Sequence, residues 1–209
     1  MEACIRLAHP HTPCYVLIWL IRILNIISRM LQPNIFSFSG SNLLAWTSAY
    51  ALWEPISYFL FPAVFKAATT QEYYNPKKFP FAIVAFGDYI YSTMIFIIAQ
   101  VAITGLFGPL AAPNWIEWAK RLGIFVGIQW ISDLSFYGFI TQVAKVYKNK
   151  YIDFFNRYGS QVGIGAPIGD SIYATIWLLT TQFVASAMPI WGQVLAIATL
   201  LFMMLVFSY

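Results

Sequence analysis

Long apolar runs, each about as long as a membrane is thick, constrain this chain more than any other feature. They occupy most of its 209 residues, of which 60% are hydrophobic and only 10% charged. Soluble domains carry about 25% charged residues, and a helix needs about 20 mostly apolar residues to cross a hydrocarbon layer of roughly 30 Å. The sequence therefore predicts an all-α, polytopic transmembrane helix bundle that forms one integral membrane domain over residues 1–209.

The positions of these runs predict five membrane spans. They cover Leu43–Phe65, Asp88–Leu106, Leu122–Val146, Asp170–Met188 and Ile190–Phe207. In the N-terminal region, residues 1–40, the run Cys14–Leu31 carries Arg22, Asn25 and Arg29 at spacings that place them on one helical face. We expect this run to be an amphipathic helix at the membrane surface, with a sixth span or an uncleaved anchor as the alternative.

One short phrase occurs twice in the chain. The copies are Gly87-Asp88-Tyr89-Ile90-Tyr91-Ser92-Thr93, followed by Gln100, and Gly169-Asp170-Ser171-Ile172-Tyr173-Ala174-Thr175, followed by Gln182. The runs Asp88–Leu106 and Asp170–Met188 are each 19 residues long and are stopped by Gly108-Pro109 and by Pro189, and this length matches the hydrocarbon thickness at about 1.5 Å per residue. The phrase predicts a parallel repeat of two-helix hairpins, at about residues 80–146 and 164–209, with each aspartate where its helix enters the membrane.

Lys and Arg lie mostly between the apolar runs. Seven of them fall in the connectors 66–78 and 145–157, whereas Lys120 and Arg121 fall on the opposite side. The positive-inside rule then puts the seven-charge side and the C-terminus in the cytoplasm. This distribution sets topology and is not that of a nucleic-acid surface, so the expected partners are the lipid bilayer and either further copies of the chain or other membrane proteins.

Acidic residues within the spans are the main candidates for chemistry, because burying a carboxylate in lipid is costly. Asp133 and Glu54 lie near the middle of their spans, where each either specifies packing in a hydrogen-bonded or protonated form or belongs to an ion or proton pathway. Asp88 and Asp170 are interpreted either as helix N-caps or as two carboxylates that meet across the repeat. The candidate intramembrane polar or ion site comprises Glu54, Asp133, Asp88, Asp170, Tyr91, Tyr173, Gln100 and Gln182.

Other patterns point to structure. Gly123 and Gly127 have the spacing of a close helix contact, with packing inside the chain as the default. Tryptophans near the predicted span ends are expected to be interfacial anchors: Trp46, Trp53, Trp115, Trp118, Trp177 and Trp191. Four possible zinc ligands, Cys4, His9, His11 and Cys14, match no standard spacing. We therefore predict no metal site, no cofactor and no catalytic residue of the familiar enzyme classes.

Two resemblances follow from particular residues. Gly87-Asp88-Tyr89-Ile90-Tyr91-Ser92 resembles the Gly-Asp motif of presenilin-type intramembrane aspartyl proteases, which implies two carboxylates that share a proton and activate water. The chain departs from that motif, because Ala85 and Pro167 replace its first glycine and no Tyr-Asp or Pro-Ala-Leu sequence is present. The stretch 75–80 (Asn-Pro-Lys-Lys-Phe-Pro), leading into Gly87-Asp88-x-x-Tyr91-Ser92, looks like uncharacterised multi-pass membrane proteins of large DNA viruses, which implies a virion or assembly membrane protein.

Taken together, these patterns predict a non-enzymatic, multi-pass membrane protein that serves as a structural or assembly component of a membrane. The alternative is a small channel, transporter or transporter subunit that uses the intramembrane acidic residues. An intramembrane aspartyl protease is the remote alternative.

Overall fold

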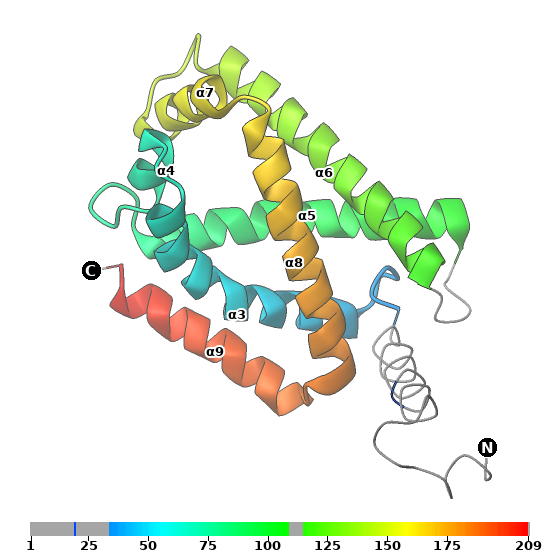
Figure 1. Cartoon of the computed structure of the whole chain (residues 1–209). Helices are drawn as coiled ribbons and strands as arrows, with labels where there is room; N and C mark the ends of the chain where they lie inside the picture. The colour runs from blue at the N-terminus through cyan, green and yellow to red at the C-terminus, as the bar shows by residue number, and fades with distance from the viewer. Residues whose placement is uncertain (1–18, 20–33, 109–114, 209) are drawn as a thin grey trace, which may run out of the picture.

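The chain is helical throughout the part that the structure describes. The computed structural model describes Trp19, residues 34–108 and residues 115–208, and its helices are labelled as in Figure 1. They are α3 (Gly40–Val64), α4 (Ala68–Tyr73), α5 (Phe81–Phe107), α6 (Trp115–Val143), α7 (Lys150–Val162), α8 (Gly165–Ala187) and α9 (Ile190–Val206). The predicted all-α fold is confirmed. The N-terminal amphipathic run, apart from Trp19, and the four possible zinc ligands lie outside the described residues.

Short polar side chains, glycine and proline set several helix ends. The Ser39 hydroxyl caps α3 by accepting a hydrogen bond from the backbone N–H of Asn42 at 3.2 Å, and the Asn149 side chain accepts two backbone N–H groups at the start of α7. Gly108, with φ of +68°, ends α5 because glycine adopts a left-handed conformation at little cost. Pro189 follows the end of α8. Both helix stops predicted from the repeated phrase are therefore confirmed.

Asp88 and Asp170 lie inside their helices and do not cap them. α5 begins at Phe81, seven residues before Asp88, and α8 begins at Gly165, five residues before Asp170. The interpretation of the two aspartates as N-caps is therefore wrong. The physical reason is that the apolar residues upstream pack in the core, as Phe81 does with 0% exposure, and this packing extends the helix toward the connector.

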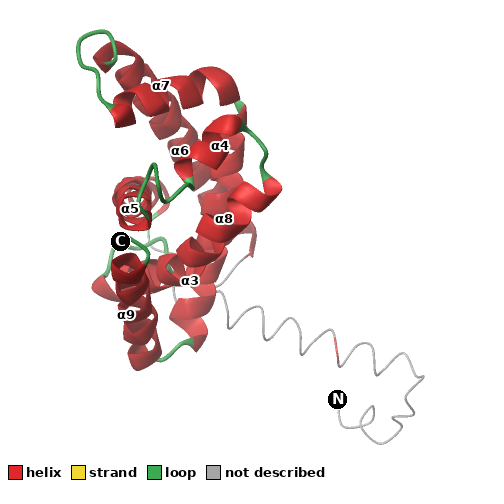
Figure 2. Ribbon diagram, turned by 90° about the vertical axis from the view of Figure 1, so that its left-hand side faces the viewer, coloured by secondary structure: helices red, strands yellow, loops and turns green. Residues whose placement is uncertain are grey.

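The long helices cross one another at different angles, with α4 and α7 at one end of the bundle (Figures 1 and 2). α3 packs chiefly against α8 and α9, while α6 packs against both α5 and α8. α7 contacts α4 and α6 and makes an angle of 99° with α8. Helix α7 therefore lies across the end of the bundle, whereas α8 extends along the bundle.

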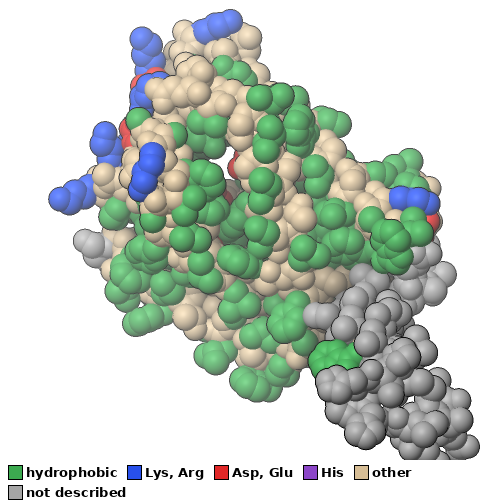
Figure 3. Space-filling model, in the orientation of Figure 1, with side chains coloured by type: hydrophobic (Ala, Val, Ile, Leu, Met, Phe, Trp, Pro, Cys, Tyr) green, Lys and Arg blue, Asp and Glu red, His purple; other side chains and the backbone are tan. Residues whose placement is uncertain are grey.

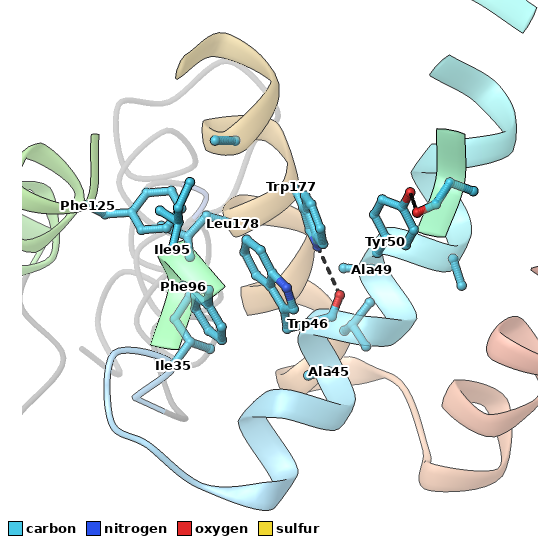
Figure 4. Packing of buried hydrophobic residues seen from close by; sticks show 14 of the residues in the cluster. Ile35, Ala45, Trp46, Ala49, Tyr50, Ile95, Phe96, Phe125, Trp177 and Leu178 are labelled. Atoms are coloured by element: carbon cyan, nitrogen blue, oxygen red, sulfur yellow. Dashed lines mark hydrogen bonds between the residues drawn. The ribbon is translucent and has the colours of Figure 1, made fainter. Parts of the chain in front are cut away.

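An aromatic stack from three helices forms the centre of the core (Figure 4). The Trp46 ring of α3 stacks on Phe96 of α5 with ring centroids 4.0 Å apart, and on Trp177 of α8 at 3.9 Å. The indole N–H of Trp177 donates to the Trp46 carbonyl oxygen at 2.9 Å, and that of Trp46 donates to the Thr93 hydroxyl at 3.1 Å. The stack thus joins α3, α5 and α8 by ring contact and by hydrogen bonds together.

The prediction of interfacial tryptophan anchors is wrong for three members of that set, Trp46, Trp118 and Trp177, which are buried in the core. Trp46 and Trp177 are 0% and 1% exposed, whereas Trp115 and Trp191 are 69% and 72% exposed. A tryptophan near the end of an apolar run suits either an interface or a core. Trp46 is a core residue because its ring is covered by aromatic side chains of two neighbouring helices.

The outward faces of the long helices are apolar, and the interior contains polar side chains. Exposed residues on α5 recur at helical spacing, including Ile83, Ile90, Met94 and Val101, and the visible surface is largely hydrophobic (Figure 3). Helices α5 and α6, with 27 and 29 residues, are each long and apolar enough to cross a membrane. The bent pair α7–α8 is a third candidate if the two helices count as one span. Helix α9 is apolar but has only 17 residues. Among the described residues, two or three helices are thus membrane-span candidates.

The repeat is less regular in the structure than in the sequence. α5 and α6 pack against each other, whereas α8 packs mainly on α3 and α6, and α9 on α3 and α5. The parallel hairpin repeat and the five-span arrangement therefore stay predictions.

Candidate functional site

Four acidic residues on four different helices lie in the same half of the bundle. Glu54 stands ten residues before the end of α3, and Asp133 ten residues before the end of α6. Asp88 stands seven residues after the start of α5, and Asp170 five residues after the start of α8. At about 1.5 Å per residue, all four lie within about 15 Å of the helix ends that face α4 and α7. We call these four residues the acidic cluster.

Glu54 is the most deeply buried member of the acidic cluster, with 1% exposure. Its Oε2 accepts hydrogen bonds from the Tyr173 hydroxyl of α8 at 3.2 Å and from the Ser57 hydroxyl, one turn further along α3, at 3.3 Å. Its Oε1 is buried without a hydrogen-bond partner. A buried polar atom without a partner is costly, so this oxygen is suited to binding a proton or a water molecule.

Asp133 has a similar environment between α5 and α6. Its Oδ1 accepts hydrogen bonds from the Tyr91 hydroxyl and from the Gln129 side-chain amide, both at 2.8 Å. Its Oδ2, like Oε1 of Glu54, is buried without a hydrogen-bond partner. The two central acids predicted from the sequence therefore share one arrangement, in which one oxygen is held by a tyrosine and the other is free.

The tyrosines that hold these two acids are corresponding residues of the repeated phrase. Tyr91 stands three residues after Asp88, and Tyr173 stands three residues after Asp170. Each phenol donates to a carboxylate on a neighbouring helix, Tyr91 to α6 and Tyr173 to α3. The phrase thus supplies, in both copies, one aspartate and one hydrogen-bond donor for a second acid.

Asp88 is half-buried and accepts a hydrogen bond from the Tyr73 hydroxyl of α4 at 2.8 Å. Asp170, also half-buried, interacts electrostatically with Asp133 and with Asp88, and Asp88 interacts with Glu54. Ionised carboxylates repel one another, and no hydrogen bond links Asp88 directly to Asp170 among the described residues.

Tyrosines on α4 and α7 are sensitive to this negative charge. Burial raises the pKa of Tyr73 and Tyr74, and the charges of Asp88 and Glu54 raise it further. Burial also raises the pKa of Tyr158, with additional contributions from Asp170, Asp88 and Asp133. Of these three phenols, that of Tyr73 contacts the acidic cluster directly, through its hydrogen bond to Asp88.

No cation neutralises the acidic cluster within the described ranges. The ion pairs there involve Glu72, with Arg157 and Lys78, and Glu117, with Lys120. The same residues contain no group of three His, Cys, Asp or Glu placed to hold a metal ion. Figure 3 shows acidic atoms recessed in a hollow between α4 and α8.

The two glutamines of the repeated phrase do not join the acidic cluster. Gln100 and Gln182 each lie twelve residues beyond their aspartates, about 18 Å further along the helix. Gln100 is buried and donates to the carbonyl oxygens of Ile35 and Ser37 at 2.8 and 3.1 Å, and Gln182 accepts from the Trp118 indole at 3.4 Å. In the structure both satisfy polar groups at the opposite end of the bundle.

Gly123 and Gly127 do not pack inside the chain, which corrects the default expectation. Both lie on an exposed face of α6, and a Cβ atom at either position would meet nothing within 4 Å. The core side of α6 instead presents larger side chains such as Phe125 and Gln129.

Three residues of the site were not identified from the sequence. Ser57 and Gln129 stand three and four residues from their acids, and this helical spacing was a usable signal. Tyr73 comes from a connector helix and carried no such signal.

Comparison of the chain with protein-family models, with curated proteins and with solved structures gave no match.

Proposed function

We propose that the protein is a multi-pass membrane protein that conducts protons or small hydrated cations by way of the acidic cluster. The observation that carries this proposal is that four carboxyl groups from four helices lie in the same half of the bundle, and that two of them keep a buried oxygen without a partner. Acidic residues inside membrane helices usually face the bundle interior and occur in ion and proton pathways.

Contacts between the connectors support the multi-pass topology. Arg157 of α7 binds both carboxylate oxygens of Glu72 in α4 at 3.0 Å, so the two basic connectors lie on one side of the bundle. In a membrane, the intervening pair α5–α6 would then cross and return. The Ser208 hydroxyl accepts a hydrogen bond from the backbone N–H of Ala82 at 3.1 Å, which supports a C-terminus on that same side. A five-span topology that includes α3 is consistent with these contacts, and under it the positive-inside rule would assign the basic side to the cytoplasm.

The arrangement of donors indicates how a proton moves within the cluster. Asp88 and Asp170, nearest the connectors, accept a proton from the α4 and α7 side. Glu54 and Asp133, further inside, receive it through water or a reoriented carboxyl group. The Tyr73, Tyr91 and Tyr173 hydroxyls stabilise whichever carboxyl group is ionised at that moment by donating a hydrogen bond.

Flux into vesicles tests the proposal. Full-length protein in liposomes that contain a pH-sensitive dye should take up protons when valinomycin and a potassium gradient set the membrane potential. Glu54→Gln and Asp133→Asn should lower the rate by at least about tenfold, since each removes a proton-accepting group. Glu117→Gln is the matched control, because Glu117 lies outside the cluster and pairs with Lys120 at 2.7 Å. Absence of protein-dependent proton flux in this assay, together with absence of protein-dependent potassium flux in vesicles without valinomycin, would contradict the proposal.

A structural or assembly role is the second candidate, and one observation favours it. The exposed Gly123 and Gly127 leave a shallow strip on α6 with nothing within 4 Å of a Cβ at either position. Small residues at this spacing let a second membrane helix approach closely. The partner would be another copy of this chain or a different membrane protein.

A further inference from the structure

A second polar site lies between the connectors, outside the acidic cluster. A pocket of about 650 Å³ opens there between α4, the loop that follows it, and α7. Its lining includes four cationic side chains and two carboxylates: Lys77, Lys78, Lys150, Arg157, Glu72 and Asp153. The pocket therefore carries a net positive charge. In the view of Figure 3, most of the visible Lys and Arg side chains gather at this end of the molecule.

The two carboxylates do not neutralise all four cationic side chains of the pocket. Glu72 is bound by Arg157 through both oxygens at 3.0 Å and lies 3.7 Å from the Lys78 ammonium. Asp153 stands in the first turn of α7, where the helix dipole stabilises a negative charge. Lys77 forms no ion pair among the described residues.

Lys150 is held at the pocket without a carboxylate. Its ammonium lies 4.9 Å from the centroid of the Tyr151 ring and 5.8 Å from that of Phe79. It also donates to the Lys78 carbonyl oxygen at 3.5 Å. An ammonium positioned by aromatic faces keeps its charge available for an anion.

We propose that this pocket binds a phosphate group, with Lys77 and Lys150 as the principal ligands and Arg157 and Lys78 as additional cations. Phosphate oxygens are strong acceptors for charge-assisted hydrogen bonds from ammonium and guanidinium groups. Basic pockets at the end of a membrane bundle bind anionic lipid head groups. The phosphate therefore comes from a lipid head group at the membrane surface or from a soluble phosphate, and the two sources are separable by experiment.

Thermal unfolding of the full-length protein in a nonionic detergent tests the site. The probes are dihexanoyl phosphatidic acid, dihexanoyl phosphatidylcholine and inorganic phosphate, each titrated at constant ionic strength. A ligand that binds the folded state alone raises the midpoint temperature in a saturable way. A saturable rise with phosphatidic acid, absent with inorganic phosphate, identifies a lipid head group, and a rise with inorganic phosphate identifies a soluble ligand.

Two double variants locate the binding. Lys77→Gln with Lys150→Gln should weaken apparent affinity by at least about tenfold, because both unpaired ammonium groups are removed. Lys145→Gln with Lys148→Gln removes the same charge from the neighbouring loop, outside the pocket lining, and should leave the affinity nearly unchanged. The proposal is overturned if neither phosphate source raises the midpoint, if phosphatidylcholine acts as strongly as phosphatidic acid, or if both double variants lose affinity equally.

Discussion

Replacing Trp46 with alanine should destabilise the protein strongly, because this side chain sits between two other rings. Trp46 has no exposed surface, stacks on Phe96 and Trp177 at 4.0 and 3.9 Å, and meets Phe125 edge-on at 6.2 Å. Truncating a buried tryptophan costs about 3–5 kcal/mol, and each aromatic pair contributes about 0.5–1.5 kcal/mol beyond its buried area. The hydrogen bond from Trp177 to the residue 46 carbonyl oxygen survives the substitution, so we expect a loss of about 3 kcal/mol or more.

The matched control is Trp191→Ala, the same substitution at a side chain that is 72% exposed. Surface changes typically alter stability by less than about 0.5 kcal/mol. The assay is equilibrium unfolding of the full-length protein, titrated from a mild detergent into sodium dodecyl sulfate and followed by far-ultraviolet circular dichroism. The expected loss at Trp46 shifts the folding equilibrium by about two powers of ten. Equal effects of the two substitutions would refute the core assignment and restore Trp46 as an interfacial anchor.

Two further outcomes are expected. Gly127→Leu should weaken self-association in mild detergent, measured by light scattering after gel filtration. Gly105→Leu, on the exposed face of α5, should leave self-association unchanged. If the unmodified protein is monomeric in this assay, the assembly role is contradicted. Stability should also fall as the pH rises above about 10. Tyrosine in the unfolded chain ionises there, whereas burial and nearby carboxylates raise the pKa of Tyr158 and keep its phenol protonated in the folded protein. The unfolded state is therefore favoured as the pH increases. Tyr158→Phe should flatten this decline in unfolding midpoints between pH 8 and 11, and Tyr147→Phe, at an exposed side chain, should leave it unchanged.

The sequence predicted helix ends better than helix starts. Gly108 and Pro189 act through the backbone, by a left-handed conformation and by a missing N–H group, so their effect is local and can be predicted from the residue type. The start of α5 depends on the burial of Phe81 against other helices. That contact is tertiary and cannot be read from the local sequence. The prediction therefore started the helix at Asp88, seven residues later than its actual start at Phe81.

The candidate site was predictable in its residue types and less so in its partners. Glu54 and Asp133 were identified because a carboxyl group inside an apolar run needs a compensating interaction. Tyr91 and Tyr173 were identified through the repeat, but the acids that they bind lie on helices distant in sequence. Gln100 and Gln182 belong to the same repeat and still lie outside the cluster, because a repeat fixes spacing along a helix and not depth relative to neighbouring helices.

The stack of Phe96, Trp46 and Trp177 has a further consequence for transport. These three rings lie seven or eight residues from Asp88, Glu54 and Asp170 on the same three helices, about 10–12 Å deeper in each case. Under the proposed function the acidic cluster would act as a proton reservoir, separated from the opposite end of the bundle by the buried aromatic stack. Protons would charge the reservoir quickly from the connector side, and the parting of the three rings would limit the rate of passage through the membrane.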